Sequence, residues 1–268
     1  MGASDRPTPP GLGLFLSEPG RALGELGLFL ASSPLRRSLP RGDGHPVLVL
    51  PGLTADDWST RPLRGVLADL DYRVHGWRLG RNIGPTARIS AGIRSRLADL
   101  HERYDQPVTL IGWSLGGIYA RDLARESPHA VRQVITLGSP FKIERYGDTR
   151  VHGVFNRFSN RHVERRTLPL EHGLGPLPVP TTAIYTRHDG IVSWRACLDH
   201  PSEQAENVAV LTSHCGLGFH PAVIWVVADR LAQQAGRWRP FAPPPLLRRL
   251  FPTAESRPAP AGAAEAAA

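Results

Sequence analysis

Short apolar runs alternate with segments of helical periodicity through most of the chain. The run 46–50, Pro-Val-Leu-Val-Leu, ends at Pro51-Gly52, as is typical of a strand buried on both faces. The same pattern predicts strands at 72–77, 108–111, 131–137, 181–185 and 208–211. Apolar residues at helical spacing predict helices at 61–70, 89–104, 115–125 and 222–234. This alternation predicts an α/β fold with a mainly parallel sheet and helices on both faces.

The pattern changes at both ends of the chain and once in its interior. Segment 1–44 is rich in Pro, Gly and Leu, and 21–35 predicts a short amphipathic helix packed on the body of the protein. Contact of this helix with a membrane surface is the alternative, because Arg36 and Arg37 follow it. Within the body, 45–240, the interval 139–180 has no clear strand and is predicted to be a cap or lid. The Pro- and Ala-rich segment 241–268 is predicted to be a disordered tail.

Composition indicates one globular α/β domain. The chain has 268 residues, of which 41% are hydrophobic, and α/β folds often reach about 250 residues as a single unit. The net charge is +8, and Lys142 is the only lysine among 32 basic residues. The arginines are scattered rather than interleaved with aromatic residues in a block, so nucleic acid is not an expected partner.

Several other protein classes are disfavoured by the sequence. Two cysteines, Cys197 and Cys215, cannot form a disulfide framework, although one bridge between them stays open, and no Cys-x-x-Cys spacing indicates zinc. The N-terminus does not have the pattern of a secretory signal, and no apolar run approaches about 18 residues. We therefore expect a cytoplasmic protein without a resident metal, with peripheral membrane contact as an open alternative.

Gly112-Trp113-Ser114-Leu115-Gly116 matches Gly-x-Ser-x-Gly. The motif alone is a weak signal, but it directly follows a predicted strand and precedes a predicted helix, which is the context of a nucleophile elbow. Gly112 and Gly116 leave room for the sharp turn, which holds Ser114 at its tip with an exposed hydroxyl. An ordinary serine in a glycine-rich turn is the alternative.

A serine hydroxyl needs a base, and the base needs a carboxylate that orients it. In this type of fold the two follow the serine in the order acid, then histidine. Asp189 follows the predicted strand 181–185, and His214 follows 208–211. Among the rivals, His220 precedes Pro221 at a predicted helix start and is interpreted as a cap or core residue, and Asp199 has no strand before it.

The remaining candidates surround this centre. The N–H of Leu115 and the N–H of Leu53, in the loop after 46–50, are expected to form an oxyanion hole. Substrate contacts are expected from Trp58, Trp113 and Phe141, with the core of the cap as the alternative for Phe141. Trp77 and Asn82 are placed at the border of the cleft.

Six segments between about 45 and 236 carry a family resemblance: LVLPGLTADDWST, HGWRLGRNIGPT, IGWSLGGIYAR, VITLGSPF, IYTRHDGIVSW and SHCGLGFHPAVIWVVADRLA. With them the chain resembles the α/β-hydrolase superfamily and, within it, a group of bacterial lipases and esterases. The resemblance implies a triad of Ser114, Asp189 and His214, no cofactor, and hydrolysis of a small-molecule ester or lipid through an acyl-enzyme. An acyltransferase with the same triad and a non-catalytic lipid-surface binding protein of the same fold are the alternatives. Acyl and alcohol specificity and the oligomeric state stay open.

Overall fold

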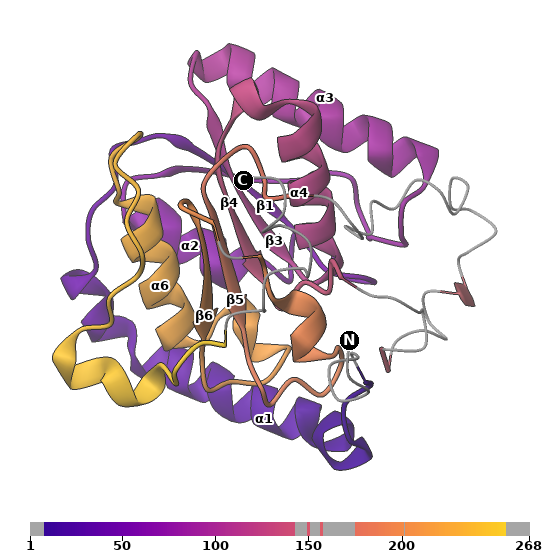
Figure 1. Ribbon diagram of the computed structural model, residues 1–268, viewed down its shortest axis with the longest axis vertical. Coiled ribbons are helices and arrows are strands. Elements are labelled where there is room, and N and C mark those ends of the chain that lie inside the picture. The colour runs from indigo at the N-terminus through magenta and orange to yellow at the C-terminus, as the bar shows by residue number, and fades with distance from the viewer. Residues whose placement is uncertain (1–7, 143–148, 151–155, 158–174, 201, 256–268) are drawn as a thin grey trace, which may run out of the picture.

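A six-stranded parallel sheet forms the centre of the protein, whose computed structural model describes residues 8–142, 149–150, 156–157, 175–200 and 202–255 (Figure 1). The strand order is β2-β1-β3-β4-β5-β6. The strands are β1 (Pro46–Leu50), β2 (Arg73–Gly76), β3 (Val108–Trp113), β4 (Val131–Leu137), β5 (Thr181–Tyr185) and β6 (Ala205–Ala209). The order reverses between β1 and β3, and the carboxyl ends of strands at such a switch point are where ligands bind in open α/β sheets.

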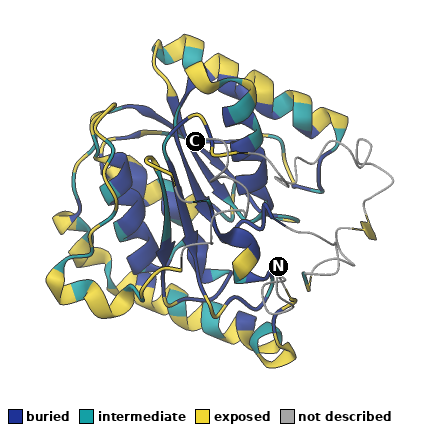
Figure 2. Ribbon diagram, viewed as in Figure 1, coloured by how far each residue is buried: buried dark blue, intermediate teal, exposed yellow. Residues whose placement is uncertain are grey.

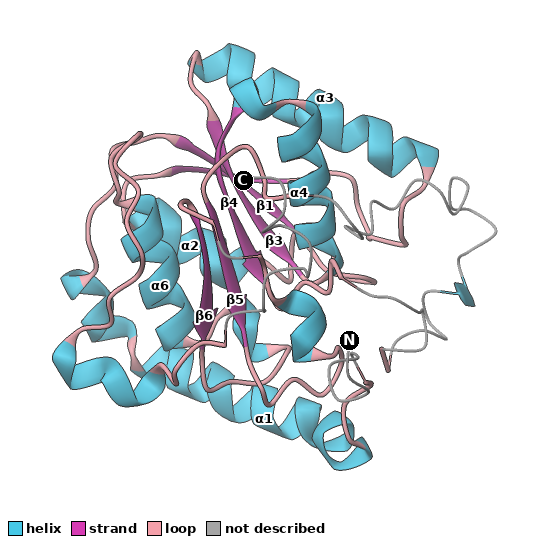
Figure 3. Ribbon diagram, in the orientation of Figure 1, coloured by secondary structure: helices cyan, strands magenta, loops and turns pink. Residues whose placement is uncertain are grey.

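Helices cover both faces of the sheet, as the sequence predicts (Figure 3). Side chains alternate along β1, so Val47 and Val49 join one core with α2 (Arg61–Asp69) and α6 (Pro221–Leu231). Leu48 and Leu50 join a second core on the other face, with α3 (Ala87–Tyr104) and α4 (Leu115–Glu126). The strands are buried between the two helical layers (Figure 2).

Helix α1 (Leu12–Ala31) crosses the end of the sheet at which β5 and β6 finish (Figure 1). It starts nine residues before the predicted helix and continues through Pro19. Glu18 and Phe29 are its buried residues, so tertiary contacts stabilise a helix that its proline and glycines disfavour. Among the described residues, no helix is both long and apolar enough to cross a membrane.

Element boundaries also differ from the prediction at β6 and α6. Strand β6 spans Ala205–Ala209 rather than 208–211, because its pairing with β5 begins at Thr181 and Ala205. Leu211, which belonged to the predicted strand, is 42% exposed. Helix α6 begins at Pro221 and ends three residues before the predicted end. The apolar pattern alone does not show where strand pairing begins.

Residues 241–255, the described part of the segment predicted to be a disordered tail, contact the body of the protein. Phe241 donates its N–H to Glu206 Oε2 at 2.6 Å, and its ring contacts Phe251 at a centroid distance of 5.0 Å. A 3₁₀-helix, Pro245–Leu250, lies between the two rings in sequence. The contacts of Phe241 and Phe251 hold this stretch on the body of the protein despite its Pro-rich composition. Residues 256–268 and most of the predicted cap, 139–180, lie outside the described residues.

Candidate active site

The turn between β3 and α4 holds Ser114 in a backbone conformation that side-chain-bearing residues rarely adopt. Its φ is 52° and its ψ is −120°. Ser114 donates its N–H to Leu137 O at 2.8 Å, and Gly117 donates to Ser114 O at 3.0 Å. A Cβ on Gly112 would lie 2.2 Å from Gly117 Cα, so the turn can close only with glycine there. The structure thus has the strand, sharp turn and helix expected of a nucleophile elbow.

The loop after β1 runs against this turn. A Cβ built on Gly52 would lie 3.2 Å from Ser114 Cβ and 3.5 Å from Trp113 O. The N–H groups of Leu53 and Leu115 form no hydrogen bonds within the described part of the chain. Leu115 also begins α4, where the helix dipole favours negative charge. The two N–H groups are therefore available to an oxyanion beside Ser114.

Asn82 fixes the shape of this loop. Its Nδ2 donates to Pro51 O at 2.8 Å, its backbone N–H donates to Ala55 O at 2.8 Å, and its carbonyl accepts from Thr54 N–H at 2.7 Å. Tyr119 Oη donates to Asn82 Oδ1 at 3.3 Å. The sequence placed Asn82 at the border of the cleft, but its side chain is completely buried and holds the loop from behind.

Asp189 and His214 lie in the loops after β5 and β6 and are hydrogen-bonded to each other. The distance from His214 Nδ1 to Asp189 Oδ2 is 2.6 Å. Asp189 Oδ1 accepts the N–H groups of Ile191 and Val192, both at 2.8 Å. The two side chains are almost fully buried. This arrangement leaves His214 Nε2 as the ring nitrogen that can exchange a proton with a substrate or a hydroxyl group.

The charges around His214 favour its protonated form. Burial alone would lower its pKa, but the Asp189 carboxylate, through its charge and its hydrogen bond, and the Glu18 carboxylate raise the pKa above its ordinary value. An imidazolium formed during proton transfer is therefore stabilised at this position.

His214 and Ser114 lie at the same end of the sheet. Trp113, the neighbour of Ser114, donates Nε1–H to His214 O at 3.2 Å. Gly138 follows Leu137, whose carbonyl accepts from Ser114, and a Cβ on Gly138 would lie 3.2 Å from His214 Nδ1. The structure therefore brings Ser114, Asp189 and His214 to one neighbourhood.

The rival residues have structural roles. His220 caps α6 and accepts from Ala222 N–H at 3.2 Å, which confirms its interpretation as a cap, and burial lowers its pKa. Both carboxylate oxygens of Asp199 bind Arg121, at 2.5 and 3.0 Å. Cys215 is a free thiol whose pKa is raised to about 12 by burial and then by the Glu18 charge, so it stays neutral near pH 7.

The predicted aromatic contacts occupy three different environments. Trp58 is 77% exposed, and Trp113 is half-buried beside His214. Phe141 lies in the hydrophobic core with the Arg121 guanidinium 3.9 Å from its ring centroid. Trp77 is also buried and donates to Gly80 O at 2.9 Å. Only Trp113 of these four contacts a triad candidate among the described residues.

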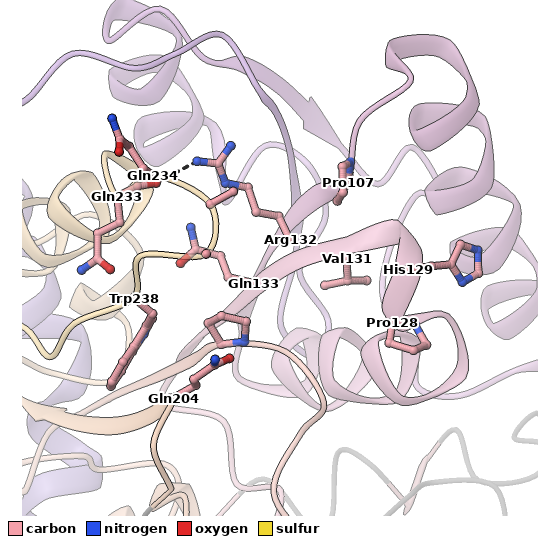
Figure 4. A pocket seen from close by; sticks show the side chains of 13 residues that line it. Pro107, Pro128, His129, Val131, Arg132, Gln133, Gln204, Gln233, Gln234 and Trp238 are labelled. Carbon is pink, nitrogen blue, oxygen red and sulfur yellow. Dashed lines mark hydrogen bonds between the residues drawn. The ribbon is translucent and has the colours of Figure 1, made fainter.

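A pocket of 290 Å³ lies at the opposite end of the sheet (Figure 4). Pro107 directly precedes β3, Val131 begins β4, and Pro180 directly precedes β5, and all three line this pocket. None of the candidate site residues lines it. This pocket at the amino ends of the strands is therefore separate from the Ser114 neighbourhood.

Sequence reasoning missed two acidic residues of this site, Glu18 and Glu25 on α1. Glu18 is 2% exposed and accepts the His214 N–H at 3.0 Å, and Glu25 accepts the Ser213 N–H at 2.7 Å. The available signal was their spacing, because residues seven apart share one face of a helix that is otherwise largely apolar.

Comparison with solved structures assigns the fold. The chain resembles lipase B of Aspergillus fumigatus with a TM-score of 0.57 and 17% identity over 72% of this chain, and the match spans about half (54%) of the length of that lipase. A structure from work on LipS and LipT, two metagenome-derived lipolytic enzymes, matches with a TM-score of 0.51 and 16% identity over 72% of this chain and 93% of that one. No family model and no curated protein sequence matches the chain. The protein has the α/β-hydrolase fold.

Proposed function

We propose that the protein is a serine hydrolase that cleaves carboxylic esters through an acyl-enzyme. The observation that carries this proposal is the strained Ser114 turn beside a buried Asp189–His214 pair, joined at 2.6 Å. This combination supplies a nucleophile, a base and a group that orients the base. The lipase and lipolytic enzymes that share the fold are consistent with it.

In the proposed reaction, Ser114 Oγ attacks the ester carbonyl while His214 Nε2 takes its proton. The N–H groups of Leu53 and Leu115 stabilise the oxyanion of the tetrahedral intermediate. The bond to the alcohol then breaks, and His214 returns the proton to that leaving group. Water attacks the acyl-enzyme as His214 takes its proton, the bond from the acyl carbon to Ser114 Oγ breaks, and His214 returns the proton to Ser114 Oγ as the acid is released. Asp189 keeps Nδ1 protonated throughout, and the proposed reaction uses no cofactor.

Hydrolysis of p-nitrophenyl esters of rising chain length tests this proposal. The parent protein should release p-nitrophenolate, and Ser114→Ala should lose that activity while keeping its fold by circular dichroism. The chain-length optimum measures the acyl pocket. Equal rates for parent and variant would exclude Ser114 as the nucleophile. Transfer of the acyl group to an added alcohol in preference to water would favour the acyltransferase alternative.

We further propose that the outer side of α1 adsorbs to an anionic lipid surface that presents the ester. Leu12, Leu16, Leu23 and Leu30 are each more than half exposed, and their spacings of four, seven and seven residues place them in one stripe. Arg36 and Arg37 follow the helix and complement anionic headgroups. The opposite side of α1 contacts the loops after β5 and β6, so the stripe lies near the candidate triad.

Sedimentation with vesicles that contain anionic phospholipid tests the adsorption. Changing Leu16, Leu23 and Leu30 together to Ser should reduce vesicle binding and hydrolysis of a vesicle-borne ester, while hydrolysis of a soluble p-nitrophenyl ester is retained. Unchanged binding would exclude the stripe as the contact. The matched control is Leu211→Ser, an exposed leucine outside α1, which should leave vesicle binding unchanged.

A further inference from the structure

One carboxylate of α1 connects the two loops that carry the proposed acid and base. Glu18 Oε1 accepts the Gly190 N–H at 2.8 Å and the His214 N–H at 3.0 Å, and Oε2 accepts the Cys215 N–H at 3.2 Å. Gly190 directly follows Asp189. The side chain of Glu18 is 3% exposed, and its one charged partner is Arg21, at 2.8 Å, within the described residues. The carboxylate thus bridges the acid loop and the histidine loop through their backbones.

Glu25 repeats this arrangement two helical turns later. Its Oε1 accepts the Ser213 N–H at 2.7 Å, and its Oε2 accepts the Ser213 hydroxyl at 2.5 Å. Consecutive N–H groups of residues 213, 214 and 215 therefore all donate to carboxylates of α1. Successive backbone N–H groups that converge in this way form an anion-binding nest. The loop that carries His214 is therefore held by the carboxylates of Glu18 and Glu25, two residues of α1.

Glycines in the loops after β5 and β6 also let α1 approach these loops closely. A Cβ on Gly190 would lie 2.5 Å from Leu14 O, and a Cβ on Gly216 would lie 1.8 Å from Glu25 Oε2. A side chain at residue 190 would collide with the backbone of α1, and one at residue 216 would displace the Glu25 carboxylate. The contact is therefore a specific feature of both loops and of the helix.

Burial of a carboxylate costs free energy unless hydrogen bonds and a charge partner compensate it. Three N–H groups and Arg21 compensate the burial of the Glu18 carboxylate. The charged and titratable groups facing His214 are Asp189 from the loop after β5 and Glu18 from α1, with Arg21 behind Glu18, Glu25 on Ser213, and the neutral thiol of Cys215. The imidazole is thus placed between two negative charges.

We propose that Glu18 is a positioning residue of the active site: it fixes the Asp189 and His214 loops to each other and stabilises the imidazolium formed during catalysis. This inference rests on the proposed serine hydrolase function. Glu18 acts through His214 and Asp189 and touches no reacting atom. Helix α1 therefore supplies a positioning residue to the active site, although no residue of the proposed triad belongs to this helix.

The test compares Glu18→Gln with Glu25→Gln in the full-length protein. Glu18→Gln keeps the size of the side chain but removes its charge, so kcat should fall about tenfold, the lower end of the loss seen when a residue that orients a metal-bound histidine is removed. The acidic limb of the kcat/KM profile should move to lower pH, because the lost negative charge raised the pKa of His214. Glu25→Gln should move that limb less, because Glu25 hydrogen-bonds to Ser213, whereas Glu18 is the α1 carboxylate that raises the pKa of His214.

Arg21→Met should change the pKa of His214 in the opposite direction, and it leaves the Glu18 side chain in place. Loss of the cation strengthens the effect of the Glu18 charge, so the acidic limb should move to higher pH. The pKa of His214 followed by NMR of the imidazole should show the same two directions, and this readout needs no turnover. If Glu18→Gln does not fold, the His214 pKa in Arg21→Met alone decides whether the Glu18 charge acts on His214.

The outcomes separate this inference from the proposed function. An unmoved His214 pKa in both Glu18→Gln and Arg21→Met would overturn the role of Glu18, whether or not the protein hydrolyses esters. Loss of hydrolysis in Ser114→Ala together with parental behaviour of Glu18→Gln would support the hydrolase and exclude the positioning role. Shifts of the His214 pKa in a protein that hydrolyses no ester would support the electrostatic contact and overturn the proposed function.

Discussion

Two Asp–His pairs of similar geometry lie at opposite ends of the sheet. His214 Nδ1 is 2.6 Å from Asp189 Oδ2 at the carboxyl end, and His45 Nδ1 is 2.5 Å from Asp43 Oδ1 just before β1. Both imidazoles are almost fully buried. The second ring nitrogen of His45 binds the hydroxyl of Thr109 at 3.0 Å, so this pair even includes a hydroxyl group.

The two histidines nevertheless have opposite charge preferences. Burial lowers the pKa of His45, and Arg132 lowers it further against the opposing effect of Asp43. Burial also acts to lower the pKa of His214, but Asp189 and Glu18 together raise it. Arg132 binds Asp43 at 3.0 Å, whereas the third group beside the His214 pair is negative. An Asp–His hydrogen bond alone therefore does not define a base, because the sign of the third charge decides whether the imidazolium is stabilised.

Accessibility separates the two pairs further. Thr109 lies near the start of the inner strand β3, in an ordinary strand conformation, and has no exposed surface. Ser114 lies half-exposed in a strained turn next to unbonded N–H groups. Under the proposed function, the Asp189–His214 pair is catalytic and the Asp43–His45 pair supports the structure.

Removal of each histidine should give the largest contrast. His214→Gln should lower kcat by about 10⁴- to 10⁶-fold, because no other group takes the serine proton. His45→Gln should keep kcat and lose about 1–3 kcal/mol of unfolding free energy, since buried hydrogen bonds to Asp43 and Thr109 are disturbed. Ester kinetics and urea denaturation of both variants measure this. Comparable losses of kcat would contradict the assignment.

Substitution of the carboxylates should give the next largest effect. Asp189→Asn should lower kcat by about 10⁴-fold, because the amide favours the wrong tautomer of His214. Asp43→Asn is the matched control and should leave kcat unchanged. A fully active Asp189→Asn would show that another group orients His214.

A third carboxylate, Asp199, should affect stability rather than catalysis. Asp199→Ala removes the buried carboxylate that binds Arg121 through two hydrogen bonds, which should cost about 3–5 kcal/mol of unfolding free energy. The kcat of the molecules that remain folded should match that of the parent. Denaturation curves and kcat normalised to fluorophosphonate-titrated sites measure the two quantities. Loss of kcat with unchanged stability would instead make Asp199 a catalytic candidate.

The smallest expected effect is the contribution of His45 to the pH dependence of the unfolding free energy. Its pKa is lowered on folding from 6.5, so its contribution to stability is complete above pH 6.5 and declines as the pH falls below that value. His45→Gln should flatten this decline in unfolding free energy, followed by urea denaturation at several pH values. His214 has a raised pKa, so its ionisation contributes stability that is greatest at low pH and is lost as the pH rises. An identical pH slope in parent and His45→Gln would contradict the assigned direction for His45.

The sequence predicts β1, β4 and β5 well because these central strands are buried along almost their whole length. β4 and β5 have the predicted bounds, and the motif around Ser114 lies in the predicted strand–turn–helix context. Asp189 and His214 follow from chain order and strand placement, and the structure brings them together.

What the sequence did not predict depends on contacts between distant segments. Glu18 and Gly190 are 172 residues apart, so their hydrogen bond leaves no local pattern. Pro19 and the glycines of α1 oppose a long helix by propensity, yet tertiary packing stabilises it. Phe241 and Phe251 hold a Pro-rich stretch on the body in the same way.

Site-resolved labelling with a fluorophosphonate tests the central claim most directly. The parent protein, treated at pH 8 and mapped by peptide mass spectrometry, should carry one phosphonate on Ser114. His214→Gln should label far more slowly, and His45→Gln should label at the parental rate. An unlabelled Ser114 in the folded parent protein, or equal labelling rates in the two histidine variants, would contradict the proposal that the strained serine and the Asp189–His214 pair act together.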